Sequence, residues 1–122
     1  MLATKKLIKF KQGQIYFFKL NPAKGNEPKK TRPCLIISNN RFNKHFNTIW
    51  VLPISSSKKY NCNLKYKISP MFVPITTKKV VGNVLVQHIR DIDSNQRVIM
   101  PCQGHISDSK LSAIRKMIGF SV

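Results

Sequence analysis

The apolar residues of this chain are divided into short runs, and that division is the strongest constraint on its fold. The longest uninterrupted runs hold four residues, at 15–18, 34–37 and 49–52, with polar or turn-forming residues between them. Runs of this length are typical of β-strands. They are also far too short to span a bilayer. The sequence therefore predicts a mainly β protein with no membrane-spanning segment.

Seven segments have the pattern of strands. They are 15–20, 34–38, 48–54, 64–68, 72–75, 80–89 and 97–100. Pro53 predicts an edge position or a bulge near the end of the third strand, because proline lacks the N–H that a ladder needs. Gly82 predicts a bend in the sixth strand.

The C-terminal end is helical in pattern. Ser107 is suited to cap a helix N-terminus, and Gly119 is suited to close the helix. Leu111, Ile114 and Ile118 then fall on one face. The predicted fold class is α+β, mainly β: a small barrel of bent antiparallel strands with a C-terminal helix, forming one domain over residues 1–122.

The charge of the chain predicts a polyanionic partner. Lys and Arg number 22 against four Asp and Glu, which gives a formal net charge of +18 at pH 7. Small soluble domains usually carry a net charge of about 2–8 in magnitude. Repulsion among so many like charges opposes folding unless a polyanion offsets it. Nucleic acid is the first candidate partner, and an acidic protein is the second.

The cysteines argue against a metal site. Cys34, Cys62 and Cys102 are an odd number without a C-x-x-C pair, and no histidine stands at ligand spacing. This usage fits reduced thiols in a cytoplasmic protein. We therefore expect neither a metal nor another cofactor.

A carboxylate and a guanidinium lie close together in one turn-rich segment. Glu27 is the only glutamate of the chain, and Arg32 follows it between Thr31 and Pro33. Such a pair can serve as a base and an anion stabiliser acting on phosphate. The alternative is an exposed ion pair of little energetic consequence.

Two further segments carry polar groups at strand ends. The first runs from Ser55 to Lys59, where hydroxyls and lysines suit phosphate oxygens, although a flexible polar loop has the same composition. The second runs from Gln87 to Asp93. It gathers Gln, His, Arg and Asp, and turn capping is the alternative role for Arg90 and Asp93.

The order of several short motifs resembles the MazF/PemK toxins of bacterial toxin–antitoxin systems. The motifs are Gly-Gln-Ile-Tyr (13–16), Leu20-x-Pro22, Gly25-x-Glu27, Arg-Pro-Cys-Leu-Ile-Ile (32–37), Leu-Pro-Ile-Ser-Ser (52–56), Ile-Arg-x-Ile-Asp (89–93) and Arg97. The resemblance covers about 11–120. It implies an SH3-like barrel, a homodimer, and metal-independent cleavage of single-stranded mRNA. It also implies neutralisation by a cognate antitoxin with an acidic tail.

The resemblance also implies roles for individual residues. Arg32 matches a catalytic arginine, Ser55 an essential threonine or serine, and Glu27 a carboxylate used in some members. The chain departs from the family at Lys30, where a small residue is usual, and at Gln87-His88, where many members have an acid before glutamine.

RNA supplies its own nucleophile, the 2′-OH, so the expected products are 2′,3′-cyclic phosphate and 5′-OH ends. In this scheme Glu27 is the base, Arg32 stabilises the phosphorane, and Ser55 donates a hydrogen bond. The proton donor for the 5′-oxygen stays open between His88 and groups not yet identified.

Other residues are expected to bind RNA rather than to react. The expected RNA-binding residues are Lys29, Lys30, Ser56, Ser57, Lys58, Lys59, His88 and Arg90. In the segment 41–47, which reads as a loop, Phe42 and Phe46 could stack on bases while asparagines read base edges. The alternative is that both rings pack beneath their own loop.

Two rival functions remain at this stage. One is a noncatalytic basic module that binds nucleic acid through a small barrel. The other is a toxin of the same fold that poisons DNA gyrase, as the related CcdB toxins do.

Overall fold

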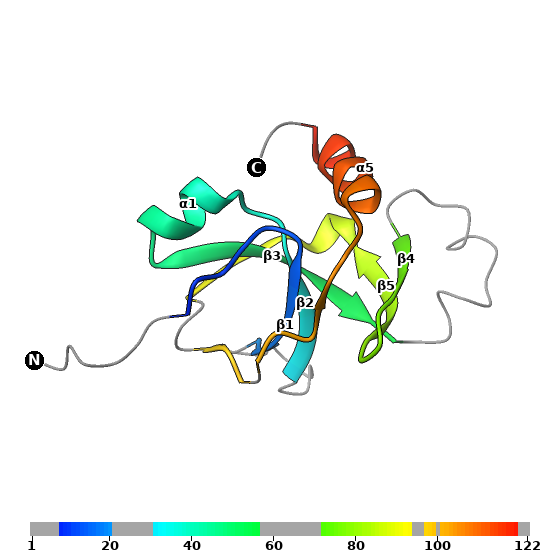
Figure 1. Cartoon of the computed structure of the whole chain (residues 1–122), viewed down its shortest axis with the longest axis horizontal. Coiled ribbons are helices and arrows are strands. Elements are labelled where there is room, and N and C mark those ends of the chain that lie inside the picture. The colour runs from blue at the N-terminus through cyan, green and yellow to red at the C-terminus, as the bar shows by residue number, and fades with distance from the viewer. Residues whose placement is uncertain (1–7, 21–30, 57–71, 94–96, 100, 120–122) are drawn as a thin grey trace, which may run out of the picture.

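A curled antiparallel sheet organises the protein around its third strand (Figure 1). The computed structural model describes residues 8–20, 31–56, 72–93, 97–99 and 101–119. Within these residues the strands are β1 (Gln14–Lys19), β2 (Thr31–Ile36), β3 (Thr48–Ser55), β4 (Phe72–Thr76), β5 (Val81–Leu85), β6 (Arg90–Asp93) and β7 (Gly104–His105). The sheet order is β4-β5-β3-β2-β1-β7, and β6 pairs with β3. The predicted fold class is thereby confirmed.

Strand β3 changes partner along one of its edges. On one side it pairs with β2, from Cys34 opposite Pro53 to Ile36 opposite Val51. On the other side it pairs first with β6, as far as Val51, and then with β5, from Ile54 onward. The sheet therefore turns from one set of partners to another within the length of this strand.

Pro53 occupies the gap between those two pairings, so the prediction of an edge position or a bulge was wrong. Trp50 turns its backbone oxygen toward β2, where it accepts from Ile37 N at 2.9 Å. Backbone groups alternate in direction along a strand, so Pro53 faces the opposite edge. Its missing N–H points to the site where β6 has ended and β5 has not begun. A central strand can thus hold a proline without losing a ladder bond.

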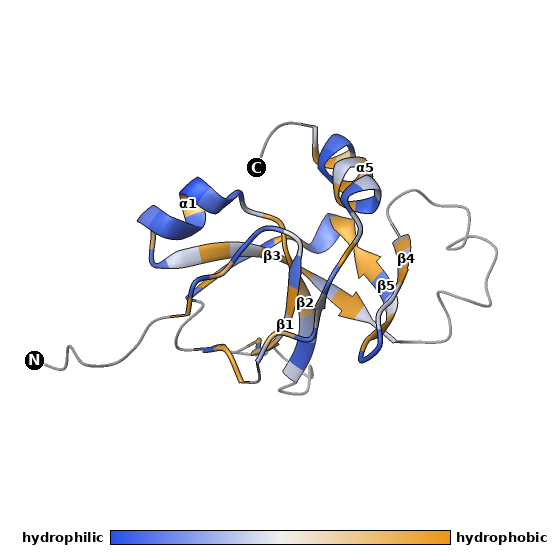
Figure 2. Ribbon diagram, in the orientation of Figure 1, coloured by the Kyte–Doolittle hydropathy of each residue, from blue (hydrophilic) through white to orange (hydrophobic). Residues whose placement is uncertain are grey.

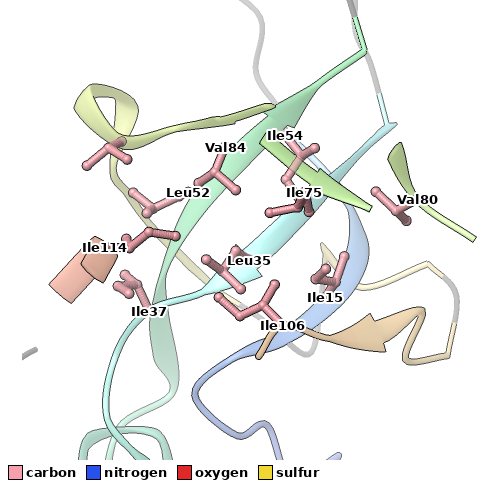
Figure 3. Close-up of a cluster of buried hydrophobic side chains, with 11 residues drawn as sticks. Ile15, Leu35, Ile37, Leu52, Ile54, Ile75, Val80, Val84, Ile106 and Ile114 are labelled. Carbon is pink, nitrogen blue, oxygen red and sulfur yellow. The ribbon is translucent and has the colours of Figure 1, made fainter. Parts of the chain in front are cut away.

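Alternation along the strands gives each face of the sheet its own apolar cluster. One face buries Ile15 of β1, Leu35 of β2, and Leu52 and Ile54 of β3, together with Ile114 (Figure 3). The opposite face buries residues one position away, including Phe18, Cys34, Ile36, Ile49 and Val51. Figure 2 shows the apolar residues concentrated in the strands. Burial on both faces explains the short continuous apolar runs of the sequence.

The predicted C-terminal helix is confirmed as α5 (Asp108–Ile118). The Ser107 hydroxyl accepts from Lys110 N at 3.3 Å at its start. Gly119 ends it with a φ of 91°, in the left-handed region that favours glycine. Ile114 is fully buried in the cluster on the first face, and Leu111 packs against the same cluster. The helix therefore closes that side of the sheet.

The prediction of a loop at 41–47 was wrong, because the structure has a short helix there, α1 (Asn40–His45). Asn39 caps it by accepting from Phe42 N at 2.8 Å. Asn43 Nδ2 donates to Ser38 O at 3.0 Å, and Ser38 Oγ donates to Asn43 Oδ1. Figure 2 shows α1 as largely hydrophilic. Side-chain capping, rather than an apolar stripe, holds this helix.

Two strand predictions differ from the structure near the C-terminus. The strand expected at 80–89 ends at Leu85, and the short 3-10 helix η1 (Val86–His88) separates it from β6. The strand expected at 97–100 is reduced among the described residues to one bridge between Phe18 and Val98. The strand expected at 64–68 lies outside the described residues. No helix in the described part of the chain is long and apolar enough to cross a membrane.

Candidate nucleic-acid cleft

Arg32 stands near the start of β2, where β1 pairs with its backbone. It pairs with Phe18 of β1 in the sheet register and is half-buried. The thiol of Cys34 donates to the Arg32 carbonyl oxygen at 3.6 Å. The sheet therefore sets the position of the residue, while its guanidinium is close enough to the surface to meet a ligand.

Ser55 ends β3 and lies beside β5. It pairs with Asn83, and only 5% of its surface is exposed. Gly82 precedes that partner in β5, and a Cβ added there would lie 2.5 Å from the Ser55 backbone oxygen. The close approach of the two strands thus depends on glycine at this point.

The turn between β4 and β5 brings Lys79 to the same region. Thr77 N donates to Val80 O at 2.7 Å, and Val80 N donates to the Thr77 hydroxyl at 2.9 Å. Lys79 N donates to that hydroxyl at 3.3 Å. One threonine side chain therefore organises the turn that carries the lysine.

These three elements enclose one cleft of about 520 Å³. Its described lining consists of Phe17, Thr31, Arg32, Pro33, Ile54, Ser55, Ser56, Lys79, Val80 and Val81. Two of these side chains are cationic and none is acidic. Hydroxyl groups and an apolar floor complete the lining. Such a cleft suits a ligand with an anionic group and an apolar part, and it puts Arg32 and Ser55, from separate sequence segments, in one place.

Cys34, two residues after Arg32 in β2, is a buried thiol. Burial raises the pKa of the Cys34 thiol to about 12, and the positive charges of Arg90 and Arg32 act in the opposite direction. Desolvation dominates because the neutral thiol loses little on burial whereas the thiolate loses its hydration. Cys34 is therefore a neutral, inert part of the core at physiological pH.

The other predicted site residues divide into two groups. Ser56 lines the cleft, whereas His88 and Arg90 are exposed residues outside its described lining. The predicted positions that lie outside the described residues are Glu27, Lys29, Lys30, Ser57, Lys58 and Lys59. The structure therefore unites Arg32, Ser55 and Ser56, and it separates His88 and Arg90 from them.

Sequence reasoning missed Lys79. The available signal was the run Thr76-Thr77-Lys78-Lys79 between two strand-like segments, which has the composition of a hairpin turn. What the sequence could not show is that this turn faces the beginning of β2. Among the described residues, no three His, Cys, Asp or Glu side chains gather as metal ligands would.

Comparison with known proteins identifies the class. A curled antiparallel sheet with a C-terminal helix is also the fold of MazF from Deinococcus radiodurans, whose crystal structure matches with a TM-score of 0.69 at 22% identity over 92% of this chain and 94% of that one. A mycobacterial endoribonuclease solved with its cognate antitoxin matches with a TM-score of 0.63 at 18% identity, over 89% and 94% of the two chains.

Sequence comparison names the family. Residues 11–122 match the model of the PemK-like, MazF-like toxins of type II toxin–antitoxin systems, so the chain belongs to that family. Endoribonuclease MazF of Staphylococcus saprophyticus is 29% identical over 116 residues, which is 92% of this chain and 90% of that protein. The family predicted from the order of motifs is confirmed.

Proposed function

We propose that this toxin is a metal-independent endoribonuclease that cuts single-stranded mRNA. The observation that carries the proposal is the cleft that brings Arg32 and Ser55 together beside Lys79. The name of the staphylococcal relative, Endoribonuclease MazF, supports the same reaction class. A phosphodiester offers the anionic group that this cleft suits, and the face of a neighbouring base offers the apolar part.

The proposed reaction is an internal transfer of the phosphorus from one oxygen to another. The 2′-oxygen attacks phosphorus, the bond from phosphorus to the 5′-oxygen breaks, and no water is consumed in this step. The products are a 2′,3′-cyclic phosphate and a 5′-OH. Because the nucleophile belongs to the substrate, the protein has to supply only proton transfer and charge stabilisation.

All roles except that of the proton donor are assigned to residues. Glu27 takes the proton of the 2′-OH, Arg32 holds the phosphate oxygens as charge develops on the phosphorane, and Ser55 donates a hydrogen bond to one of them. Lys79 holds the backbone phosphate from the hairpin opposite. The donor of the proton that the 5′-oxygen takes up is not assigned, because His88 is outside the described lining of the cleft.

The proposed partners follow from charge and from the relatives. A formal net charge of +18 favours both RNA and an acidic antitoxin. The Deinococcus MazF has been solved as a MazE-MazF complex. We propose a cognate antitoxin that covers the cleft, a homodimer as the active form, and action in the cytoplasm.

The test is cleavage of a long single-stranded RNA in EDTA. We expect discrete cuts with 2′,3′-cyclic phosphate ends. Arg32→Ala should lower the rate by about 100- to 1,000-fold, the usual cost of removing one charge-stabilising donor. Lys116→Ala, which removes an exposed charge from α5, is the control and should cut normally. RNA that wild-type protein binds but leaves intact would instead favour a noncatalytic module or a gyrase-poisoning toxin.

A further inference from the structure

A second cleft lies at the other end of β3. It has a volume of about 420 Å³, and its described lining is Ile8, Lys9, Phe10, Lys11, Asn40, Asn43, Lys44, His45, Phe46 and Asn47. In Figure 1, α1 lies at one end of the sheet and the β4–β5 hairpin at the other. β3 has eight residues, so its ends are at most about 23 Å apart at the usual rise per residue. Among the described residues, this α1 cleft has no lining residue in common with the cleft of Arg32.

The α1 cleft contains an exposed aromatic ring on a fixed support. Phe46 stacks on Phe42 with ring centroids 4.5 Å apart and planes 29° from parallel. Phe42 in turn packs against Trp50 at 5.6 Å. Phe46 is nevertheless 59% exposed. Because Phe42 covers one face of the Phe46 ring, the exposed area includes the opposite face.

Such a ring is a platform for a planar partner. A solvent-exposed phenylalanine that is already stacked on a second ring has little conformational freedom left. A ligand that binds to it therefore has little more to restrict. Bases of single-stranded nucleic acid stack on aromatic side chains of this kind. The expected alternative, in which both rings pack beneath their own loop, holds for Phe42 alone.

The charged side chains in the described lining of the α1 cleft are all basic. Lys9, Lys11 and Lys44 are exposed lining residues, His45 stands beside them, and the described lining has no acidic side chain. A ligand that suits both features carries a flat apolar part and repeated negative charges. Single-stranded RNA has both in each nucleotide.

We infer that the α1 cleft is a second RNA-binding site, in which a base stacks on Phe46 and the backbone phosphates lie against Lys9 and Lys44. The choice of RNA as the nucleic acid rests on the proposed function. Because the two clefts lie at opposite ends of β3, this is a site for nucleotides that flank the cut. It raises affinity for long RNA without taking part in bond cleavage.

Asn43 does not read the base in this site. Both polar atoms of its side-chain amide are bonded to Ser38, and nearby Asn40 Oδ1 accepts from Gln12 N at 2.7 Å. The expectation that asparagines read base edges is therefore wrong for Asn43, which holds α1 in place. Stacking on Phe46 tolerates any base, so the stacking contact itself sets no cleavage sequence.

The test uses a 2′-O-methyl RNA of about 15 nucleotides, a length that one such binding surface accommodates. This RNA has no 2′-OH and is not cut. Phe46→Ala should weaken its binding about 5- to 100-fold, which is the range for loss of one stacked base. Ile99→Ala, which trims another exposed apolar side chain, is the control and should bind as wild type does.

Salt dependence separates the two components of the site. Replacing both lysines, in Lys9→Gln/Lys44→Gln, should reduce the slope of log affinity against log salt by about 1.4, because each phosphate contact to a single strand contributes about 0.7. Phe46→Ala should leave the slope unchanged. An abasic oligomer of the same length should bind equally well to wild type and Phe46→Ala.

Three results would overturn the inference. One is an RNA affinity that Phe46→Ala leaves unchanged. Another is that Phe46→Ala weakens binding of the abasic oligomer as much as it weakens binding of the RNA with bases. The third is a Phe46-dependent affinity for poly-glutamate without one for RNA, which would assign the cleft to an acidic peptide. None of these measurements involves cleavage. Wild-type protein that stacks RNA on Phe46 but never cuts it would refute the proposed function and leave this inference standing.

Discussion

The contact between Gly82 and Ser55 makes Gly82→Ala the most informative single substitution outside the clefts. Gly82 does not have a positive φ, so alanine can adopt its backbone conformation. The conflict is with main-chain atoms. The new Cβ would lie 2.5 Å from Ser55 O and 3.1 Å from Ser55 C, and neither atom can rotate away. β5 and β3 have to separate at the residue proposed to bind the phosphate.

The expected loss of stability follows from two opposing effects. Overpacking a close-packed site costs about 1–3 kcal/mol. Replacing glycine restricts the unfolded chain and offsets about 0.4–1 kcal/mol of that cost. The free energy of unfolding should therefore fall by about 1–2 kcal/mol, measured by urea denaturation at a fixed protein concentration. Val81→Ala, at an adjacent and 64% exposed position, should change it by less than about 0.5 kcal/mol.

The same substitution should slow cleavage of RNA. The two strands have to part by about 0.9 Å to bring the 2.5 Å contact to an ordinary distance, and if both move equally the Ser55 backbone shifts by roughly half an ångström. Displacements of about 1 Å can cost around 100-fold in rate, so we expect a loss of about 10-fold in the EDTA assay. A Gly82→Ala protein as stable as wild type, with an unchanged cleavage rate, would refute the reasoning. It would mean that the two strands adjust without moving the hydroxyl.

Two further predictions concern the core. Ile114→Ala should lower the free energy of unfolding by about 2–5 kcal/mol, because Ile114 is fully buried where α5 meets the sheet. Lys116→Ala, at an exposed position of the same helix, should have almost no effect. Equal urea midpoints for the two variants would contradict this packing. In the folded protein the pKa of the Cys34 thiol is raised from its ordinary 9.0 to about 12. The thiol therefore ionises at a lower pH in the unfolded chain than in the folded protein, and the free energy of unfolding falls as the pH rises above 9. Between pH 8 and 9.5, wild type should lose about 0.8 kcal/mol more than Cys34→Ala in urea unfolding, and parallel pH profiles would show that the thiol is not buried as described.

Sequence patterns predicted the parts of the fold that local chemistry determines. The four-residue apolar runs became β1, β2 and β3 to within a few residues, because each strand is buried on both faces. Ser107 and Gly119 correctly marked the ends of α5, because caps act on their own backbone neighbours. These features need no knowledge of what packs against them.

The features that were predicted wrongly depend on distant partners. Pro53 was expected at an edge because its tolerance in a central strand depends on where β5 and β6 stop pairing. α1 has too few apolar residues for a periodic pattern, and one of its hydrogen bonds comes from Gln12, which is 28 residues away in the sequence. Lys79 joins the cleft only because the β4–β5 hairpin folds over the start of β2.

The pairing of β1 with β7 has a consequence for the order of events during synthesis. Ile15 lies opposite Gly104, and the cluster on the same face also requires Ile106 and Ile114. The first strand therefore lacks these partners when it is synthesised. At about 5–20 residues per second, roughly 5–20 s pass between the synthesis of Ile15 and that of Ile114. The apolar floor beneath Arg32 and Ser55 is incomplete throughout this interval, so the cleft forms well after its first strand has been translated.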